Sequence, residues 1–343
     1  MSSAVDILRN YSGRKLRIME VCGTHTHEIF RLGIRSLLSE NIELVSGPGC
    51  PVCVTPPGFI DSAIELATRH KAIITTFGDL IRVPGSNSSL AGVRKDGAVV
   101  KAVYSPLDAL DIARSNPDQE VVFLAVGFET TTPSACIAVK KAREENLKNF
   151  SILTANKTMP QAYKALQGSA DAFLYPGHVH AIIGTGLCED LTREGVSGVV
   201  AGFTAELLVK ALSMIVEMSQ SGVPFFANAY SSIVKSQGNL AAQKLIADMM
   251  QPCDCVWRGL GEIKQSGMAL KDEFAGFDAV KKFKLVPGEG RTNPGCRCGE
   301  VLRGNCKPCD CPLFGKVCDP LHPVGACMVS GEGACSAFYQ YAR

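Results

Sequence analysis

Short runs of β-branched and aliphatic residues alternate with amphipathic stretches through the first two thirds of the chain, and this alternation constrains the fold most strongly. Strands that alternate with helices form parallel sheets with helices on both faces, and roughly 200 residues of this pattern predict two such sheets. The expected strands are Leu16–Val21, Ile42–Ser46, Ala72–Phe77, Ala98–Tyr104, Val121–Val126, Ser151–Ala155, Ala172–Tyr175 and Gly198–Gly202. The expected helices are Phe59–Arg69, Pro106–Ser115, Pro133–Glu145, Pro160–Gln167 and Ala205–Ser219.

The composition changes after about Cys253, where Gly, Pro and Cys become frequent and aliphatic residues become scarce. A segment with so few aliphatic side chains cannot build a hydrophobic core, so we expect a metal centre to stabilise it. The pattern predicts a first α/β domain at 15–120 and a second at 121–250. A cysteine-rich domain is expected at 251–343, together with residues 1–14.

The balance of charges argues against two classes of partner. With 35 basic and 33 acidic side chains, the chain has a formal charge of +2 and offers no electrostatic case for nucleic acid or an anionic membrane. The N-terminus lacks the long apolar core of a signal peptide, and no apolar run approaches the ~18 residues of a membrane span. We therefore expect a cytoplasmic protein.

Fifteen cysteines are unusual for a protein in that compartment. Because cytosolic thiols are kept reduced, metal or redox sites are expected in place of a disulfide framework. Eight of the fifteen lie between Cys296 and Cys335. Their spacing allows a zinc site built from CRC and CKPC, or a [4Fe–4S] cluster, and favours neither.

The stretch SGPGCPVCVTPPG, residues 46–58, holds Cys50 and Cys53 in a frame of prolines and glycines. Proline restricts the backbone and glycine frees it, so we expect a shaped loop and not a helix or a central strand. A Cys-x-x-Cys pair can cycle through a disulfide or chelate a metal, although the setting of a thioredoxin is missing. Together with Cys22, the pair offers three thiolates to one soft ion such as iron or zinc. The alternative is a turn in which the two thiols have no chemical role.

The motif CGTHTHE, residues 22–28, follows the first expected strand. It places the Cys22 thiol near the imidazoles of His25 and His27. A thiol at a helix N-terminus and close to histidine has a lowered pKa and a raised reactivity, which predicts a reactive or metal-binding Cys22. In the alternative interpretation Cys22 is a buried thiol and the histidines cap the helix.

Further polar side chains follow other expected strands. Glu129 and Thr130 lie in GFETTTPS, Asp79 lies in TTFGDLIR, and His178 and His180 lie in GHVH. Ligands of open α/β sheets bind beyond the carboxyl ends of the strands, so we expect these loops to share one cleft with CGTHTHE and GPGCPVC. Helix capping by the threonines and structural hydrogen bonds from the histidines are the alternatives.

Several of these motifs resemble the HypD family of maturation factors, which belongs to the NiFe-hydrogenase assembly pathway. The resemblance rests on CGTHTH, GPGCPVC, GFETT and the spacing Cys296-x14-Cys311-x6-Cys318-x16-Cys335, and it covers nearly the whole chain. It implies two parallel-sheet α/β domains that face a cleft, and a loop-rich and helical third domain with a [4Fe–4S] cluster on those four cysteines. It transfers no role to the remaining cysteines of the tail, Cys298, Cys306, Cys309 and Cys327.

The resemblance also implies a function. Cys22 and a cysteine from a small HypC-type chaperone would bind mononuclear iron, on which Fe(CN)2CO is assembled, with Cys50 and Cys53 as a redox-active or iron-binding pair. A HypE-type partner would donate cyanide from a thiocyanate by a reductase-type step, and the hydrogenase large-subunit precursor would be served indirectly. His25 and His27 would tune Cys22 or manage protons. Glu332 would support the metal centre or contact a partner.

The residues leave three competing functions open. An iron–sulfur thiol–disulfide oxidoreductase acting on a partner protein needs Cys50 and Cys53, but has no use for Cys22 or mononuclear iron. A non-catalytic assembly platform uses its cysteines only to hold metal. A zinc-binding structural protein contains no iron.

Overall fold

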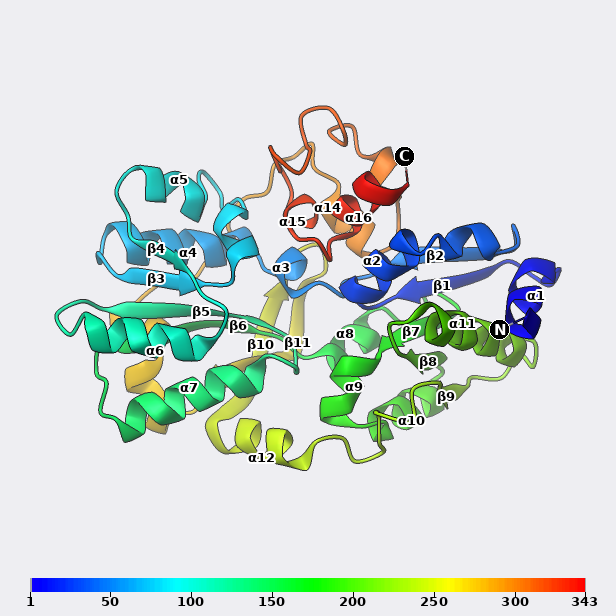
Figure 1. The fold of residues 1–343 in the computed structure, drawn as a ribbon, viewed down its shortest axis with the longest axis horizontal. Coiled ribbons are helices and arrows are strands. Elements are labelled where there is room, and N and C mark those ends of the chain that lie inside the picture. Colours follow the sequence, from blue (N-terminus) through cyan, green and yellow to red (C-terminus); the bar gives the residue numbers. More distant parts are fainter. Residues whose placement is uncertain (1, 343) are drawn as a thin grey trace.

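The computed structural model of the chain describes residues 2–342 and contains two parallel β-sheets, which confirms the predicted α/β class (Figure 1). Sheet A has five strands in the order β2-β1-β7-β8-β9, formed by Ile42–Ser46, Leu16–Glu20, Ala172–Pro176, Gly198–Ala201 and Phe226–Asn228. Sheet B has four strands in the order β4-β3-β5-β6, formed by Val100–Ala102, Ile73–Thr76, Val121–Gly127 and Phe150–Asn156.

The chain does not complete one sheet before it begins the other. It forms β1 and β2 of sheet A, builds all of sheet B from β3 to β6, and then returns to sheet A for β7, β8 and β9. The predicted domain boundaries at 15–120 and 121–250 place β1, β2 and β3 in one domain. In the structure β1 and β2 belong to sheet A and β3 belongs to sheet B, so the strand order differs from these boundaries. The physical reason is that strand-forming patterns are local, whereas parallel pairing joins distant segments: Met19 of β1 stands opposite both Val45 and Phe173.

Helices cover sheet B on both faces. Val122 and Leu124 of β5 pack with one pair of helices, whereas Val121 and Phe123 pack with the other pair. Because successive side chains of a strand point to opposite faces, one uninterrupted apolar run serves both layers. The first pair is α4 (Pro57–Thr68) and α5 (Leu90–Lys95), and the second is α6 (Pro106–Ser115) and α7 (Thr132–Glu144).

Sheet A is covered in the same way. Ile18 and Leu174 pack with α1 (Ser2–Asn10) and α11 (Ala205–Ser219), beside α2 (Gly23–Arg31) and η1 (Ile34–Leu37). Met19 and Phe173 face the other side, where the core includes α8 (Met159–Ala165), α9 (Gly177–Ile183) and α10 (Gly186–Arg193). This second core also includes several cysteines of the C-terminal tail, so the tail is packed against sheet A. No helix between residues 2 and 342 is long and apolar enough to cross a membrane.

An antiparallel hairpin, β10 (Met250–Trp257) and β11 (Gly261–Leu270), follows α12 (Leu240–Met249). The expectation of loops from about Cys253 was wrong for this hairpin, because Trp257 and Leu270 are buried in cores shared with sheets A and B. Beyond it, loops join short helices as expected. The short elements are η3 (Asp272–Phe277), α13 (Ala279–Phe283), α14 (Cys298–Leu302), η4 (Pro308–Asp310), α15 (Ala326–Val329) and α16 (Ala334–Tyr341). The first two, η3 and α13, pack against β6, and the tail from α14 onward lies above α3 and α2 in Figure 1.

The proline-rich stretch 46–58 was expected to contain no helix, and this was wrong. One helical turn, α3 (Pro51–Val54), lies inside it, and α4 starts at Pro57. Pro51 occupies the first turn of α3, where its missing N–H costs nothing, and the Cys50 sulfur accepts a hydrogen bond from the Cys53 N–H. The rigid frame therefore encloses a single turn of helix that carries both cysteines.

The loops after β1 and β2 are pressed together at Gly49. A Cβ on Gly49 would stand 2.2 Å from Cα and N of Cys22, which requires the backbone to move. We therefore expect Gly49→Ala to lower the free energy of unfolding by about 2 kcal/mol or more, measured by chemical denaturation. Gly276→Ala is the control, because a Cβ there meets nothing within 4 Å. An equal loss of stability in the two variants would contradict this account.

Candidate functional site

Cys22 lies at the carboxyl end of β1, as the N-cap residue of α2, and its side chain is buried. Two neighbouring loops reach it. The loop after β2 packs Gly49 against the Cys22 backbone, and His178 of α9, after β7, brings Nε2 to 4.0 Å from Cys22 Sγ. Because β2, β1 and β7 are adjacent in sheet A, the structure brings the motifs CGTHTH, GPGCPVC and GHVH together at one edge.

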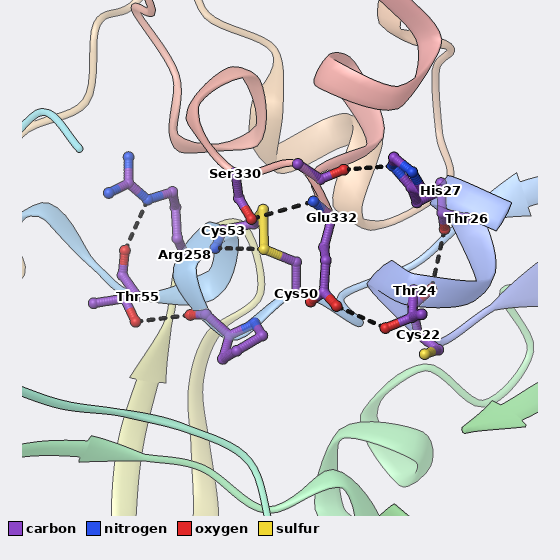
Figure 2. The surroundings of a disulfide bond; sticks show 12 residues. Cys22, Thr24, Thr26, His27, Cys50, Cys53, Thr55, Arg258, Ser330 and Glu332 are labelled. Atoms are coloured by element: carbon purple, nitrogen blue, oxygen red, sulfur yellow. Dashed lines mark hydrogen bonds between the residues drawn. A yellow bond between two sulfur atoms is a disulfide. The ribbon is translucent and has the colours of Figure 1, made fainter. Parts of the chain in front are cut away.

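Cys50 and Cys53 form a disulfide across α3, with their Cα atoms 5.2 Å apart. A Cβ on Gly23 would stand 3.2 Å from the Cys50 Cβ, so the disulfide lies beside the residue that follows Cys22. Figure 2 shows the disulfide next to Ser330 and Glu332 of the tail. Reduction of this bond by two electrons would place two more thiols beside Cys22.

The tail is attached to the first turns of α2. The Thr24 hydroxyl donates a 2.6 Å hydrogen bond to Glu332 Oε1 (Figure 2). His27 Nδ1 donates to the Gly331 carbonyl at 3.0 Å, and the Tyr341 hydroxyl lies 3.4 Å from His27 Nε2. His27 and Glu332 therefore join the tail to the helix that begins at Cys22.

The two imidazoles nearest to Cys22 are uncharged at neutral pH. His25 Nε2 donates to the Gly202 carbonyl at 3.0 Å, and Phe203 packs on the rings of both His25 and His178. Burial lowers the pKa of His25 to about 3, with a further contribution from His178, and burial lowers the pKa of His178 to about 4. Neither ring therefore supplies a positive charge to Cys22.

The expected activation of Cys22 by a lowered pKa was wrong for the protein alone. The pKa of the thiol is raised to about 12: burial is the main cause and nearby Glu332 contributes, and together they outweigh the lowering by hydrogen bonds from the His25 backbone and from Thr24. The expectation assumed a solvated helix terminus with a charged histidine. The tail covers this terminus, so the cost of burying a thiolate outweighs the favourable dipoles.

Glu129 follows β5 of sheet B and is buried. Its Oε1 accepts a 2.8 Å hydrogen bond from the Met159 N–H, whereas Oε2 has no partner among residues 2–342. Burial raises the pKa of Glu129 to about 7. Thr130 is exposed, and Thr131, the N-cap residue of α7, makes no capping hydrogen bond through its side chain. The proposed capping by the threonines is therefore not found.

Two candidates point elsewhere. His180 is buried, with Nδ1 2.9 Å from the Gly184 carbonyl and Nε2 3.5 Å from the Tyr163 hydroxyl. These contacts hold its ring in the core, which is a structural role. Asp79 is exposed on η2 (Gly78–Arg82). Within residues 2–342, neither residue hydrogen-bonds to Cys22 or to the disulfide, so the structure does not bring these two into the site.

Four cysteines of the tail are in mutual contact. Cys298 interacts with Cys296, with Cys327 and with Cys335. The interaction with Cys298 raises the pKa of Cys296, and hydrogen bonds from Cys298 and Cys335 lower the pKa of Cys327. Cys318 accepts a hydrogen bond from the Val324 N–H and lies within electrostatic range of Cys296 and Cys298; Cys311 Sγ faces the Gly295 carbonyl. Cys298 and Cys327, to which the sequence assigned no role, thus lie among the predicted cluster ligands.

Arg258 connects this cysteine group with α3. Its Nε donates to the Thr55 carbonyl at 2.9 Å and its N–H to the Val54 carbonyl at 2.7 Å, as Figure 2 shows for Thr55. The buried guanidinium is within electrostatic range of Cys298, Cys327 and Cys296. A buried positive charge beside several sulfurs favours thiolates, the form that binds metal.

The donor set is chemically suited to iron. Thiolates hold [4Fe–4S] clusters, and six cysteines of the tail, Cys296, Cys298, Cys311, Cys318, Cys327 and Cys335, lie in the contacts described above. In the described part of the chain, however, no three His, Cys, Asp or Glu side chains stand in an arrangement that could hold a metal ion. The cysteine side chains would therefore have to rotate when a cluster binds.

The full sequence matches a protein-family model described as the hydrogenase formation hypA family, HypD, over residues 2–342. The chain belongs to the HypD family. The hydrogenase maturation factor HypD of Escherichia coli (strain K12) is 45% identical over 339 residues, which cover 96% of this chain and 90% of that protein. The factor of the same name from Azotobacter vinelandii is 43% identical over 342 residues, with the same two coverages. A putative hydrogenase expression/formation protein of Methanocaldococcus jannaschii is 42% identical, covering 96% of this chain and 93% of its own.

Sequence reasoning missed three residues of this HypD-family site. The CRC motif indicated Cys298 as a possible ligand, since neighbouring thiols often share a metal. The family spacing, however, implied only Cys296 of these two cysteines. Cys327 has no cysteine near it in the sequence, and Arg258 lies in the turn that follows β10, a strand that was not expected. Only the folded chain brings these residues together.

The buried carboxyl group of Glu129 makes stability depend on pH. Its pKa of about 7 exceeds the ordinary 4.5, so the stabilisation from the bound proton is complete below pH 4.5 and is lost as the pH rises through 7. Glu129→Gln removes this titration. We expect the wild type to lose up to about 3 kcal/mol of unfolding free energy relative to this variant between about pH 5 and pH 8. Denaturation at several pH values measures the difference in unfolding free energy between the wild type and Glu129→Gln. The corresponding difference for exposed Glu262→Gln should stay flat over this range, and an equally flat difference for Glu129→Gln would refute the account.

Proposed function

We propose that this HypD-family chain is a scaffold for the assembly of Fe(CN)2CO in NiFe-hydrogenase maturation. Cys22 binds the iron together with a cysteine from a HypC-type small chaperone. The Cys50–Cys53 pair supplies electrons for the transfer of cyanide from a HypE-type donor, and a [4Fe–4S] cluster in the tail supplies electrons to the pair. The hydrogenase large-subunit precursor is served indirectly.

One observation carries this proposal: the first turn of α2, which begins after Cys22, the helical turn that holds the disulfide, and the cysteine-rich tail lie against one another. α15, which contains Cys327, packs against α3, and Glu332 is bonded to Thr24 of α2. Iron binding, electron storage and electron entry therefore have adjacent candidate sites. This adjacency also favours the scaffold over the thiol–disulfide oxidoreductase, in which Cys22 would have no role.

Cys22 suits iron that is held only temporarily. While Cys50 and Cys53 are joined in a disulfide, Cys22 is the one thiol at the end of β1, so most coordination positions stay open for diatomic ligands and the partner's cysteine. The thiol is protonated in the protein alone, because burial raises its pKa. Iron binding expels this proton, and the cation compensates for burial of the thiolate.

The disulfide suits a two-electron step. Two electrons and two protons convert Cys50–Cys53 into two thiols. These thiols then reduce a thiocyanate R–S–C≡N: the S–CN bond breaks, cyanide leaves with its electron pair, R–SH forms, and the disulfide is restored. The tail cysteines would hold the [4Fe–4S] cluster, which would supply low-potential electrons one at a time; two such transfers and two protons would regenerate the thiols of Cys50 and Cys53.

The iron scaffold is tested by infrared spectroscopy of the protein, purified anaerobically after co-production with a HypC-type chaperone and a HypE-type donor. We expect cyanide and carbonyl bands in the spectral window that protein leaves empty. Cys22→Ser should abolish them, whereas Cys136→Ala, at a buried cysteine in α7, should retain them. Bands that persist in Cys22→Ser would refute the scaffold. A wild type without bands that still contains one cluster's iron and sulfide would favour the oxidoreductase.

The cluster ligands are tested by measuring iron and acid-labile sulfide in purified variants. Cys298 and Cys335 are in contact, so we expect both Cys298→Ser and Cys335→Ser to lose more than about half of the iron and sulfide. The control Cys309→Ser should keep full content, because Cys309 is exposed. Full content in Cys298→Ser would instead support the set implied by the family spacing, Cys296, Cys311, Cys318 and Cys335.

A further inference from the structure

A second pair of cysteines lies on β10, separate from the candidate site. Cys253 and Cys255 flank Asp254, and both are partly exposed. The strand pairing shifts register between them, so a bulge separates the two residues. Both sulfurs face Gly267 of β11: a Cβ there would stand 3.0 Å from Cys253 Sγ and 3.3 Å from Cys255 Sγ. Because Gly267 has no side chain, the space beside both sulfurs stays open.

A buried lysine faces this pair. Lys157 follows β6 and is 1% exposed. Its Nζ lies 2.8 Å from Cys255 Sγ, donates to the Val256 carbonyl at 3.0 Å, and stands 5.5 Å from the centre of the Trp257 ring. No Asp or Glu between residues 2 and 342 forms an ion pair with Lys157.

This arrangement discriminates between the possible uses of two thiols. A buried ammonium needs hydrogen-bond acceptors, and those within reach of Lys157 are the Cys255 sulfur and the Val256 carbonyl. The same ammonium repels a metal cation, which argues against a metal site. A thiolate beside a lysine is instead the arrangement of a nucleophilic cysteine. Cys253 differs, because burial and then the charge of Cys255 raise the pKa of Cys253 to about 11, so it keeps its proton.

We propose that Cys253 and Cys255 form a second thiol–disulfide exchange site, in which Cys255 attacks, Lys157 is its counter-ion and Cys253 resolves the adduct. The substrate class is a small-molecule disulfide R–S–S–R, for which oxidised glutathione is the probe. This inference does not depend on the proposed hydrogenase function. It uses none of the residues assigned to iron or to the cluster.

The exchange balances in two steps. The Cys255 thiolate attacks one sulfur of the substrate, the S–S bond breaks, and one RS⁻ leaves with the electron pair and takes a proton from water. Cys253 then loses its proton to water and attacks Cys255 in the mixed disulfide, which releases the second RS⁻. The dithiol is oxidised to a Cys253–Cys255 disulfide, and the substrate is reduced to two thiols.

The test is anaerobic reaction of the full chain with oxidised glutathione, followed by rapid alkylation and peptide mass spectrometry. The wild type should yield the Cys253–Cys255 disulfide, and Cys253→Ser should accumulate glutathione on Cys255. Lys157→Met should slow the modification of Cys255 about tenfold, whereas Lys264→Met, at an exposed lysine of β11, should leave the rate unchanged.

Two results would overturn the proposal. One is a wild type that forms no Cys253–Cys255 disulfide while Cys253→Ser traps no adduct. The other is an unchanged rate in Lys157→Met with a native circular dichroism spectrum. If Lys157→Met fails to fold, Lys157→Arg replaces it: this variant keeps the cation and should react within about threefold of the wild type, and a larger loss would count against the counter-ion role.

Discussion

The position of β1 between β2 and β7 in sheet A is the constraint on which the site depends. β1 pairs in parallel with β2 on one edge and with β7 on the other, so three loops from distant parts of the chain leave the sheet side by side. Those loops supply Cys22, Cys50 and His178. Between β2 and β7 the chain builds the whole of sheet B. It then returns to sheet A, where the pairing of β7 with β1 fixes the geometry of the site.

Burial controls the chemistry of this site. Without a cation the structure favours neutral forms: the Cys22 thiol keeps its proton, and His25 and His178 stay uncharged. The C-terminal tail maintains this state by covering the start of α2 through Glu332 and His27. In the proposed scaffold, an iron ion would meet one soft donor, the Cys22 thiol, which suits iron that must later leave.

The hairpin of β10 and β11 connects the sulfur chemistry of the molecule. At one end of β10, Trp257 is buried and the next residue, Arg258, lies between α3 and the cysteines of the tail. Further back on the same strand, Cys255 faces Lys157 of sheet B. The two cations differ in their surroundings: Arg258 stands beside Cys296, Cys298 and Cys327, whereas Lys157 faces the single pair Cys253 and Cys255. The first arrangement suits a metal cluster, and the second suits thiol exchange.

The sequence by itself determined most strands and covering helices of the two parallel sheets, because apolar periodicity and proline positions act over a few residues. It also placed CGTHTH, GPGCPVC and GHVH at strand ends, and its motifs identified the HypD family. Tertiary structure alone decided that β1 pairs with β7, that Cys298 and Cys327 join the other cysteines, and that a hairpin begins at Met250. It also reversed the expected pKa of Cys22. These outcomes depend on desolvation and on contacts between segments far apart in the chain, and such energies exist only once the chain has folded.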